Sequence, residues 1–61
     1  MITIKVKQAA SNSFPDGWAT FNYEEPEREY AIEHWNFLQA LPFQSEAVWL
    51  ENGTVIEEVT L

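Results

Sequence analysis

The sequence has no cysteine, one histidine and only two glycines among its 61 residues. Without cysteine there is neither a disulfide framework nor a thiolate nucleophile, and in so short a chain this favours a reducing cytoplasm over secretion. The serines cluster in predicted loops, so no Ser-His catalytic arrangement is indicated. Gly17 and Gly53 both lie in predicted turns, which leaves no glycine-rich phosphate loop. We therefore predict that the protein is not an enzyme.

The acidic residues do not show the spacing of a metal site. The pairs Glu24-Glu25 and Glu57-Glu58 lack the central glycine of a calcium loop, and Ala31 stands where a Glu-x-x-His motif ending at His34 would need glutamate. A carboxylate pair for glycoside hydrolysis would need a sugar-sized groove, which so short a chain hardly supplies. We expect no metal and no cofactor.

Long apolar runs are also missing. No stretch approaches the roughly 20 residues of a membrane span, and the start of the chain has no signal-peptide pattern, so we expect a soluble cytoplasmic protein. The length predicts a single domain, residues 1–61, which buries only about 60% of the surface that its unfolded chain exposes. Three Trp, two Tyr and four Phe must therefore supply much of the core.

Basic residues are scarce. Ten acidic residues against three basic ones give a formal net charge of -7. A field of this sign repels nucleic-acid phosphates and anionic membranes, and it attracts a basic surface on another protein. We expect no direct binding to nucleic acid or membrane. The alternative is that the charge only keeps a small domain in solution.

The longest helical pattern runs from Pro26 to Leu41, with Pro42 ending it. At about 100° per residue, its apolar residues fall within an arc of roughly 160° that we expect to be buried, whereas the opposite side is mostly acidic. The expected buried set is Tyr30, Ala31, His34, Trp35, Phe37, Leu38 and Leu41. His34 is expected to be packed and hydrogen-bonded to a neighbour such as Tyr30, with a pH-sensitive contact as the alternative.

Two strands are predicted before this helix. Ile2, Ile4 and Val6 alternate with polar residues, which is the pattern of a strand with one buried face. Residues 8–17 form a turn-rich loop whose Phe14 is expected to fold onto the core, although it could instead serve binding. The second strand is residues 18–23, with Ala19, Phe21 and Tyr23 as the expected core set.

A hairpin is predicted for residues 46–61, because Asn52-Gly53 is the strongest short signal for a two-residue type I′ turn. This turn predicts the pairs Glu51–Thr54, Leu50–Val55, Trp49–Ile56, Val48–Glu57 and Ala47–Glu58. In that register the side chains that face the helix are Val48, Leu50, Val55 and Val59. Trp49 and Ile56 are left as a pair on the opposite, uncovered face.

Together these elements predict an α+β fold: a small two-layer ββαββ domain in which one helix packs on one face of an antiparallel sheet of three to four strands. Two sets of residues are candidates for partner binding. The acidic set comprises Glu24, Glu25, Glu29, Glu33, Glu57 and Glu58. The apolar set on the uncovered sheet face comprises Trp18, Trp49 and Ile56, because exposed tryptophans are favoured anchors at interfaces.

The sequence supports two functional hypotheses of different classes. In the first, the protein is a binding module whose carboxylates imitate a run of phosphates. It docks on a basic surface of a larger partner, such as a nucleic-acid-binding surface, and inhibits or modulates that partner. In size and charge the chain is similar to small acidic inhibitors of phages and mobile elements, anti-restriction and anti-CRISPR proteins among them, but no motif ties it to one family. In the second, it is a structural or assembly subunit, or a homodimer, that uses the uncovered aromatic sheet face.

Overall fold

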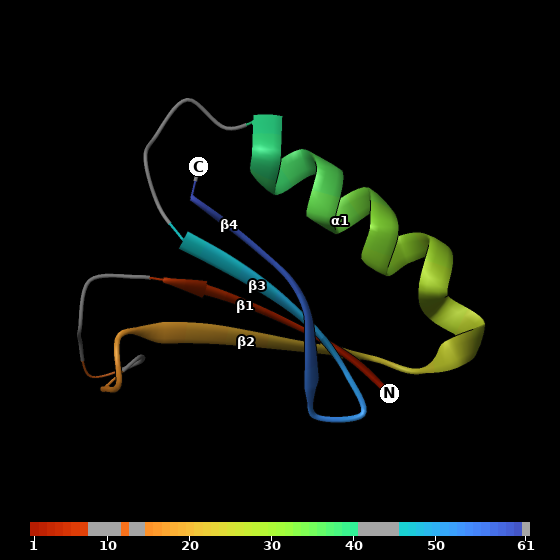
Figure 1. Cartoon of the computed structure of the whole chain (residues 1–61), viewed down its shortest axis with the longest axis horizontal. Helices are drawn as coiled ribbons and strands as arrows, with labels where there is room; N and C mark the ends of the chain where they lie inside the picture. Colours follow the sequence, from red (N-terminus) through yellow and green to blue (C-terminus); the bar gives the residue numbers. More distant parts are fainter. Residues whose placement is uncertain (8–11, 13–14, 41–45, 61) are drawn as a thin grey trace.

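The computed structural model describes residues 1–7, 12, 15–40 and 46–60 and has the predicted ββαββ order. Its helix lies on one side of an antiparallel four-stranded sheet (Figure 1). The elements in chain order are strand β1 (Ile2–Lys7), strand β2 (Trp18–Tyr23), the 3₁₀ turn η1 (Glu25–Glu27), helix α1 (Arg28–Ala40), strand β3 (Glu46–Glu51) and strand β4 (Thr54–Thr60). The prediction of an α+β, two-layer ββαββ domain is confirmed.

The strand order is β2-β1-β3-β4, so that β1 is central and pairs antiparallel with both β2 and β3. The apolar alternation of β1 explains this position, because its inward residues Ile2, Ile4 and Val6 are the most deeply buried large side chains of the described chain. The intervening Lys5 and Lys7 consequently lie on the other face of the sheet.

The helix begins close to the predicted position, but its first turn is tighter than expected. Pro26 lies in η1 and not in an α-helical turn, and α1 ends at Ala40. The backbone N–H of Glu24 donates to the carboxylate of Glu27 at 3.2 Å, which satisfies one polar group at this end. Leu41 and Pro42, predicted to end the helix, lie outside the described residues. In the described chain no helix is long and apolar enough to cross a membrane.

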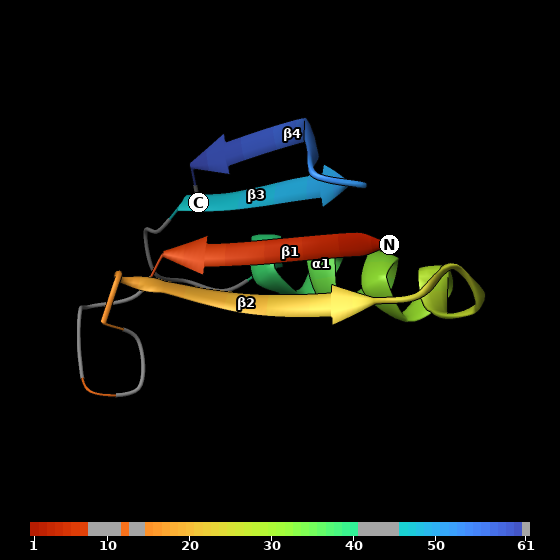
Figure 2. The same cartoon turned by 90° about the horizontal axis from the view of Figure 1, so that it is seen from below.

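Helix α1 buries a narrower face than its sequence predicts. Ala31, Trp35 and Leu38 are buried, but Tyr30 and Phe37 are 65% and 62% exposed, so the expectation that they are buried is wrong. The reason is the position of the helix, which lies over β1 and β2 and leaves the β3 and β4 side of the sheet projecting beyond it (Figure 2). A helix placed there contacts the sheet along one stripe only, and its flanks stay open.

The β3–β4 hairpin has the predicted turn but not the predicted register. Asn52 and Gly53 both have positive φ, at 52° and 82°, as a type I′ turn requires. The first two predicted pairs, Glu51–Thr54 and Leu50–Val55, are confirmed. Beyond them the register shifts, because β4 contains one extra residue, Ile56, opposite the step from Trp49 to Leu50. Such a β-bulge leaves its extra residue without a partner, and the predicted pairs are replaced by Trp49–Glu57, Val48–Glu58 and Ala47–Val59.

The side chains of β3 that face the helix are the opposite set from the predicted one. Trp49 is only 7% exposed and packs edge-on against Trp35 of the helix, with ring centroids 5.6 Å apart. It pairs with Ile4 of β1, whose side chain also faces the helix. The prediction that Trp49 lies on the uncovered face is therefore wrong, and so is the prediction that Val48, Leu50 and Val55 face the helix. Val59 does pack against the core, as predicted.

Candidate partner-binding surface

Acidic side chains collect on the helix side of the molecule. Glu29 and Glu33 stand one turn apart on the exposed side of α1, and neither has a hydrogen bond or ion pair with a residue that the structure describes. Because they are four residues apart in a helix, their Cβ atoms are separated by about 5–6 Å. Two of the predicted acidic candidates thus form an exposed, unneutralised pair.

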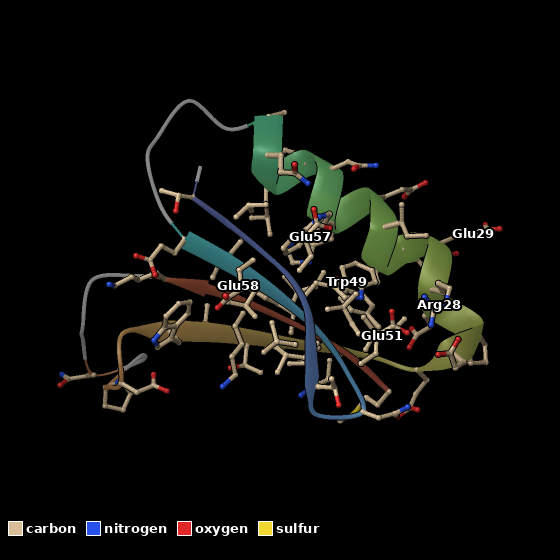
Figure 3. The ribbon with its side chains drawn as sticks, in the orientation of Figure 1. Arg28, Glu29, Trp49, Glu51, Glu57 and Glu58 are labelled. Carbon is tan, nitrogen blue, oxygen red and sulfur yellow. The ribbon has the colours of Figure 1, made fainter. Side chains whose placement is uncertain are left out.

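Arg28, the basic side chain on this side, is already used within the fold. Its guanidinium forms two hydrogen bonds with the carboxylate of Glu25, at 2.7 and 3.0 Å, and an ion pair with Glu51 of β3 (Figure 3). Arg28 also donates hydrogen bonds to Glu51, and its hydrogen bonds to the two carboxyl groups lower the pKa values of both and raise that of the guanidinium. Glu25 is therefore an internal partner of Arg28, which reduces its role as a free binding residue.

Beside this ion pair there is a hollow of about 200 Å³ between the helix and the outer hairpin, lined by Ile32, Trp35, Trp49, Glu51, Ile56 and Glu57. Trp35 and Trp49 form its apolar floor, and the exposed Ile32 and Ile56 border it from opposite elements. Ile56 was predicted to lie with Trp49 on the uncovered face. The two residues do lie close together, but on the helix side, because the bulge turns this part of β4 toward the hollow.

The bulge also separates two neighbouring carboxylates. Glu57 pairs with Trp49 and lies on the side of β4 that faces the helix, whereas Glu58 pairs with Val48 and lies on the other side (Figure 3). Of the predicted acidic set, Glu57 therefore joins Glu29 and Glu33 on the helix side, and Glu58 does not.

The uncovered face of the sheet contains a mixed set of side chains. Trp18 is half-buried there, beside Lys7 in the pairing of β1 and β2, as its strand position predicted. Both lysines are on this face, and Lys7 lies 3.8 Å from the carboxylate of Glu46. The apolar residues that share the face are Trp18, Val48, Leu50 and Val55. Trp18 is thus the single member of the predicted apolar set that this face retains.

The sequence patterns missed one surface, along the flank of the helix beside β2. Tyr30, His34 and Phe37 follow one another at i, i+4 and i+7, and Phe21 of β2 contacts the His34 ring edge-on, with centroids 4.7 Å apart. The hydroxyl of Tyr23, not that of the predicted neighbour Tyr30, lies 2.9 Å from Nδ1 of His34. Partial burial lowers the pKa of His34. Only the strand position of Phe21 and Tyr23 could have suggested this pairing.

Metal-ligating side chains do not gather in the described chain, where no group of three or more His, Asp or Glu residues is placed to hold an ion. Phe14, proposed from sequence as a loop residue that folds onto the core, lies outside the described residues. No protein family matches the chain, and neither does any curated protein sequence or solved structure.

Proposed function

We propose that this protein is a small binding module whose acidic helix side docks on a basic surface of a larger protein and inhibits or modulates it. The observation that supports the proposal is the separation of charge between the two sides of the sheet. Arg28 is the basic side chain on the helix side, and it is paired with Glu25 and Glu51, whereas Lys5 and Lys7 are on the opposite side. Among the residues that the structure describes, Glu29, Glu33 and Glu57 therefore have no cationic partner.

The mechanism is electrostatic competition. Proteins that bind nucleic acids present Arg and Lys side chains to the phosphates. A rigid row of carboxylates on a helix can occupy the same side chains, because charge complementarity speeds association and disfavours wrong partners. We place this activity in the cytoplasm, in keeping with a sequence that contains no cysteine.

The test compares two variants that lose the same charge on opposite sides of the sheet. Glu29→Gln/Glu33→Gln removes two carboxylates from the helix side, and Glu46→Gln/Glu58→Gln removes two from the uncovered face. Each protein is immobilised, exposed to a lysate of the source cells at low salt and eluted with a salt gradient, and the captured proteins are identified by mass spectrometry. The dissociation constant of the purified partner is then measured with each variant.

We expect the partner to have a basic surface, to elute at moderate salt, and to bind the helix-side variant at least several-fold more weakly than the wild type, with the control variant close to the wild type. Equal binding to all three proteins at every salt concentration would contradict the proposal, since surface ion pairs are screened by salt.

A second candidate function is that of an assembly subunit or homodimer. The observation that favours it is the uncovered sheet face, on which Trp18, Val48, Leu50 and Val55 are accompanied by charges of both signs, so that two copies could pack against each other. This function predicts a concentration-dependent dimer that Trp18→Ser dissociates. The second function would replace the first if Trp18→Ser abolished capture of the partner while both double glutamine variants captured it as the wild type does.

A further inference from the structure

We propose that the hollow between α1 and β4 receives one arginine side chain of the partner. This inference rests on the proposed function and specifies its central contact.

The size of the hollow fits a single side chain. Its volume of about 200 Å³ is below the roughly 300–1,000 Å³ of pockets that enclose small-molecule ligands. It opens at the surface between two exposed isoleucines, Ile32 at 44% and Ile56 at 58%. The methylene groups of a long side chain that enters from outside can contact both isoleucines at the opening, while its polar end reaches the tryptophan floor.

The walls favour a cation. The indole rings of Trp35 and Trp49 pack edge to face in the floor, and both residues line the hollow. Trp is the best aromatic partner for a cation, and the guanidinium group of arginine also stacks on aromatic rings, whereas the more strongly hydrated ammonium group of lysine does so less readily.

The two carboxylates of the hollow differ in what they can still bind. Glu51 accepts a hydrogen bond from the indole N–H of Trp49 at 3.1 Å and shares the Arg28 guanidinium with Glu25, so it is held in place and its charge is partly compensated. Glu57 has no hydrogen bond or ion pair with any residue that the structure describes. A guanidinium in the hollow would form a bidentate pair with Glu57.

A second copy of the chain is a poor source of this arginine. Arg28 is the single arginine of the sequence and is bound to Glu25 and Glu51, and Lys5 and Lys7 stand on the far side of the sheet. The occupant is therefore a side chain of another protein, and the net charge of -7 favours the approach of a basic one.

The experiment is an NMR titration with the peptide acetyl-Ala-Arg-Ala-amide. The indole N–H signal of Trp49 is the reporter, because its proton is donated to Glu51 at the floor of the hollow. The same peptide with citrulline in place of arginine is the matched probe, since it keeps the shape and loses the charge. We expect the arginine peptide to shift the Trp49 signal saturably, and the citrulline peptide to bind at least several-fold more weakly.

Two variants locate the contact. Glu57→Gln is expected to lower the affinity for the arginine peptide several-fold. Glu58→Gln lies one position along the strand but on the other face, and it is expected to leave this affinity unchanged. The inference is overturned if the arginine peptide causes no saturable shift of the Trp49 signal, or if the citrulline peptide binds equally well. It is also overturned if both variants bind the arginine peptide alike or if the Trp18 signal shifts instead. A Trp49 signal that moves with protein concentration in the absence of peptide overturns it too, because that shift reports self-association.

A parallel titration with a peptide of nine arginines separates this inference from the proposed function. In one outcome, the Glu29→Gln/Glu33→Gln variant binds the nine-arginine peptide more weakly, but Glu57→Gln binds the short peptide as well as the wild type does. The acidic surface then remains the docking site, and the proposed arginine pocket is wrong. In the opposite outcome, Glu57→Gln weakens binding of the short peptide, but the Glu29→Gln/Glu33→Gln variant binds every partner with wild-type affinity. The arginine pocket is then supported, and the proposed acidic docking surface is wrong.

Discussion

At the scale of single residues, Trp49 joins the core to the candidate site. Its ring packs against Trp35, and its indole N–H fixes the carboxylate of Glu51, which in turn holds Arg28. Truncating a buried Trp typically costs about 3–5 kcal/mol, a large share of the stability of so small a domain. A loss of binding in a Trp49 variant therefore reports folding, and the exposed Glu57 is the better position for a functional test.

His34 gives the folding stability a defined pH dependence. Burial lowers its pKa below the ordinary value of 6.5, so the unfolded chain takes up the proton at a higher pH than the folded protein does. The free energy of unfolding therefore falls as the pH drops below about 6.5, and it stops falling on this account once the folded form is also protonated. We expect the wild type to be less stable at about pH 5.5 than at about pH 7.5 in urea unfolding.

The control for this prediction is His34→Gln, which should reduce the stability difference between the two pH values. Glu25 and Glu51 do not interfere, because their pKa values are lowered from 4.5 and their contribution is lost only at more acidic pH. An unchanged difference in His34→Gln would show that another group is responsible.

At the scale of elements, the turn of the outer hairpin requires positive φ at both of its central residues. Gly53 has a φ of 82°, and beyond the two adjacent residues no atom lies within 4 Å of the Cβ that a substitution would add. Gly53→Ala should therefore lower the free energy of unfolding by about 1–2 kcal/mol through its unfavourable φ and not through a clash. Urea unfolding measures this loss.

Gly53→Asn is the matched comparison, because asparagine tolerates the left-handed region better than alanine does. It should be more stable than Gly53→Ala although its side chain is larger. The reverse order would mean that space, not φ, limits this position.

The elements also show how far the sequence could predict the site. Local patterns were sufficient for β1, for the Asn52-Gly53 turn and for the order of strands and helix. They were insufficient for the face of β3, because Trp49 and its neighbours Val48 and Leu50 are all apolar and alternation cannot choose between them. The choice depends on pairing with Ile4, far away in the sequence, and on the bulge at Ile56, which has no local signal.

At the scale of the whole molecule, the excess of negative charge acts against compactness. A net charge of -7 on 61 residues means that folding brings like charges together, and salt screens this repulsion. We expect the free energy of unfolding to rise by on the order of 1 kcal/mol between about 10 mM and 300 mM NaCl, as measured by urea unfolding.

The Glu29→Gln/Glu33→Gln variant should gain less from salt than the wild type, because it lacks a like-charge pair that costs about 0.2–0.5 kcal/mol in a helix. The prediction is contradicted if the free energy of unfolding of the wild type does not change with salt, or falls as salt is added. Repulsion among the carboxylates would then not destabilise the free protein.

The bulge at Ile56 has one more consequence, for the outer rim of the sheet. An edge strand with a regular ladder of free backbone groups can recruit a strand from a neighbouring molecule and start aggregation. In β4 the extra residue interrupts that ladder and bends it, and Glu57 and Glu58 place a charge on each face of the same strand. The irregularity that turns Glu57 toward the helix thus also protects this edge of the protein from its own copies at high concentration.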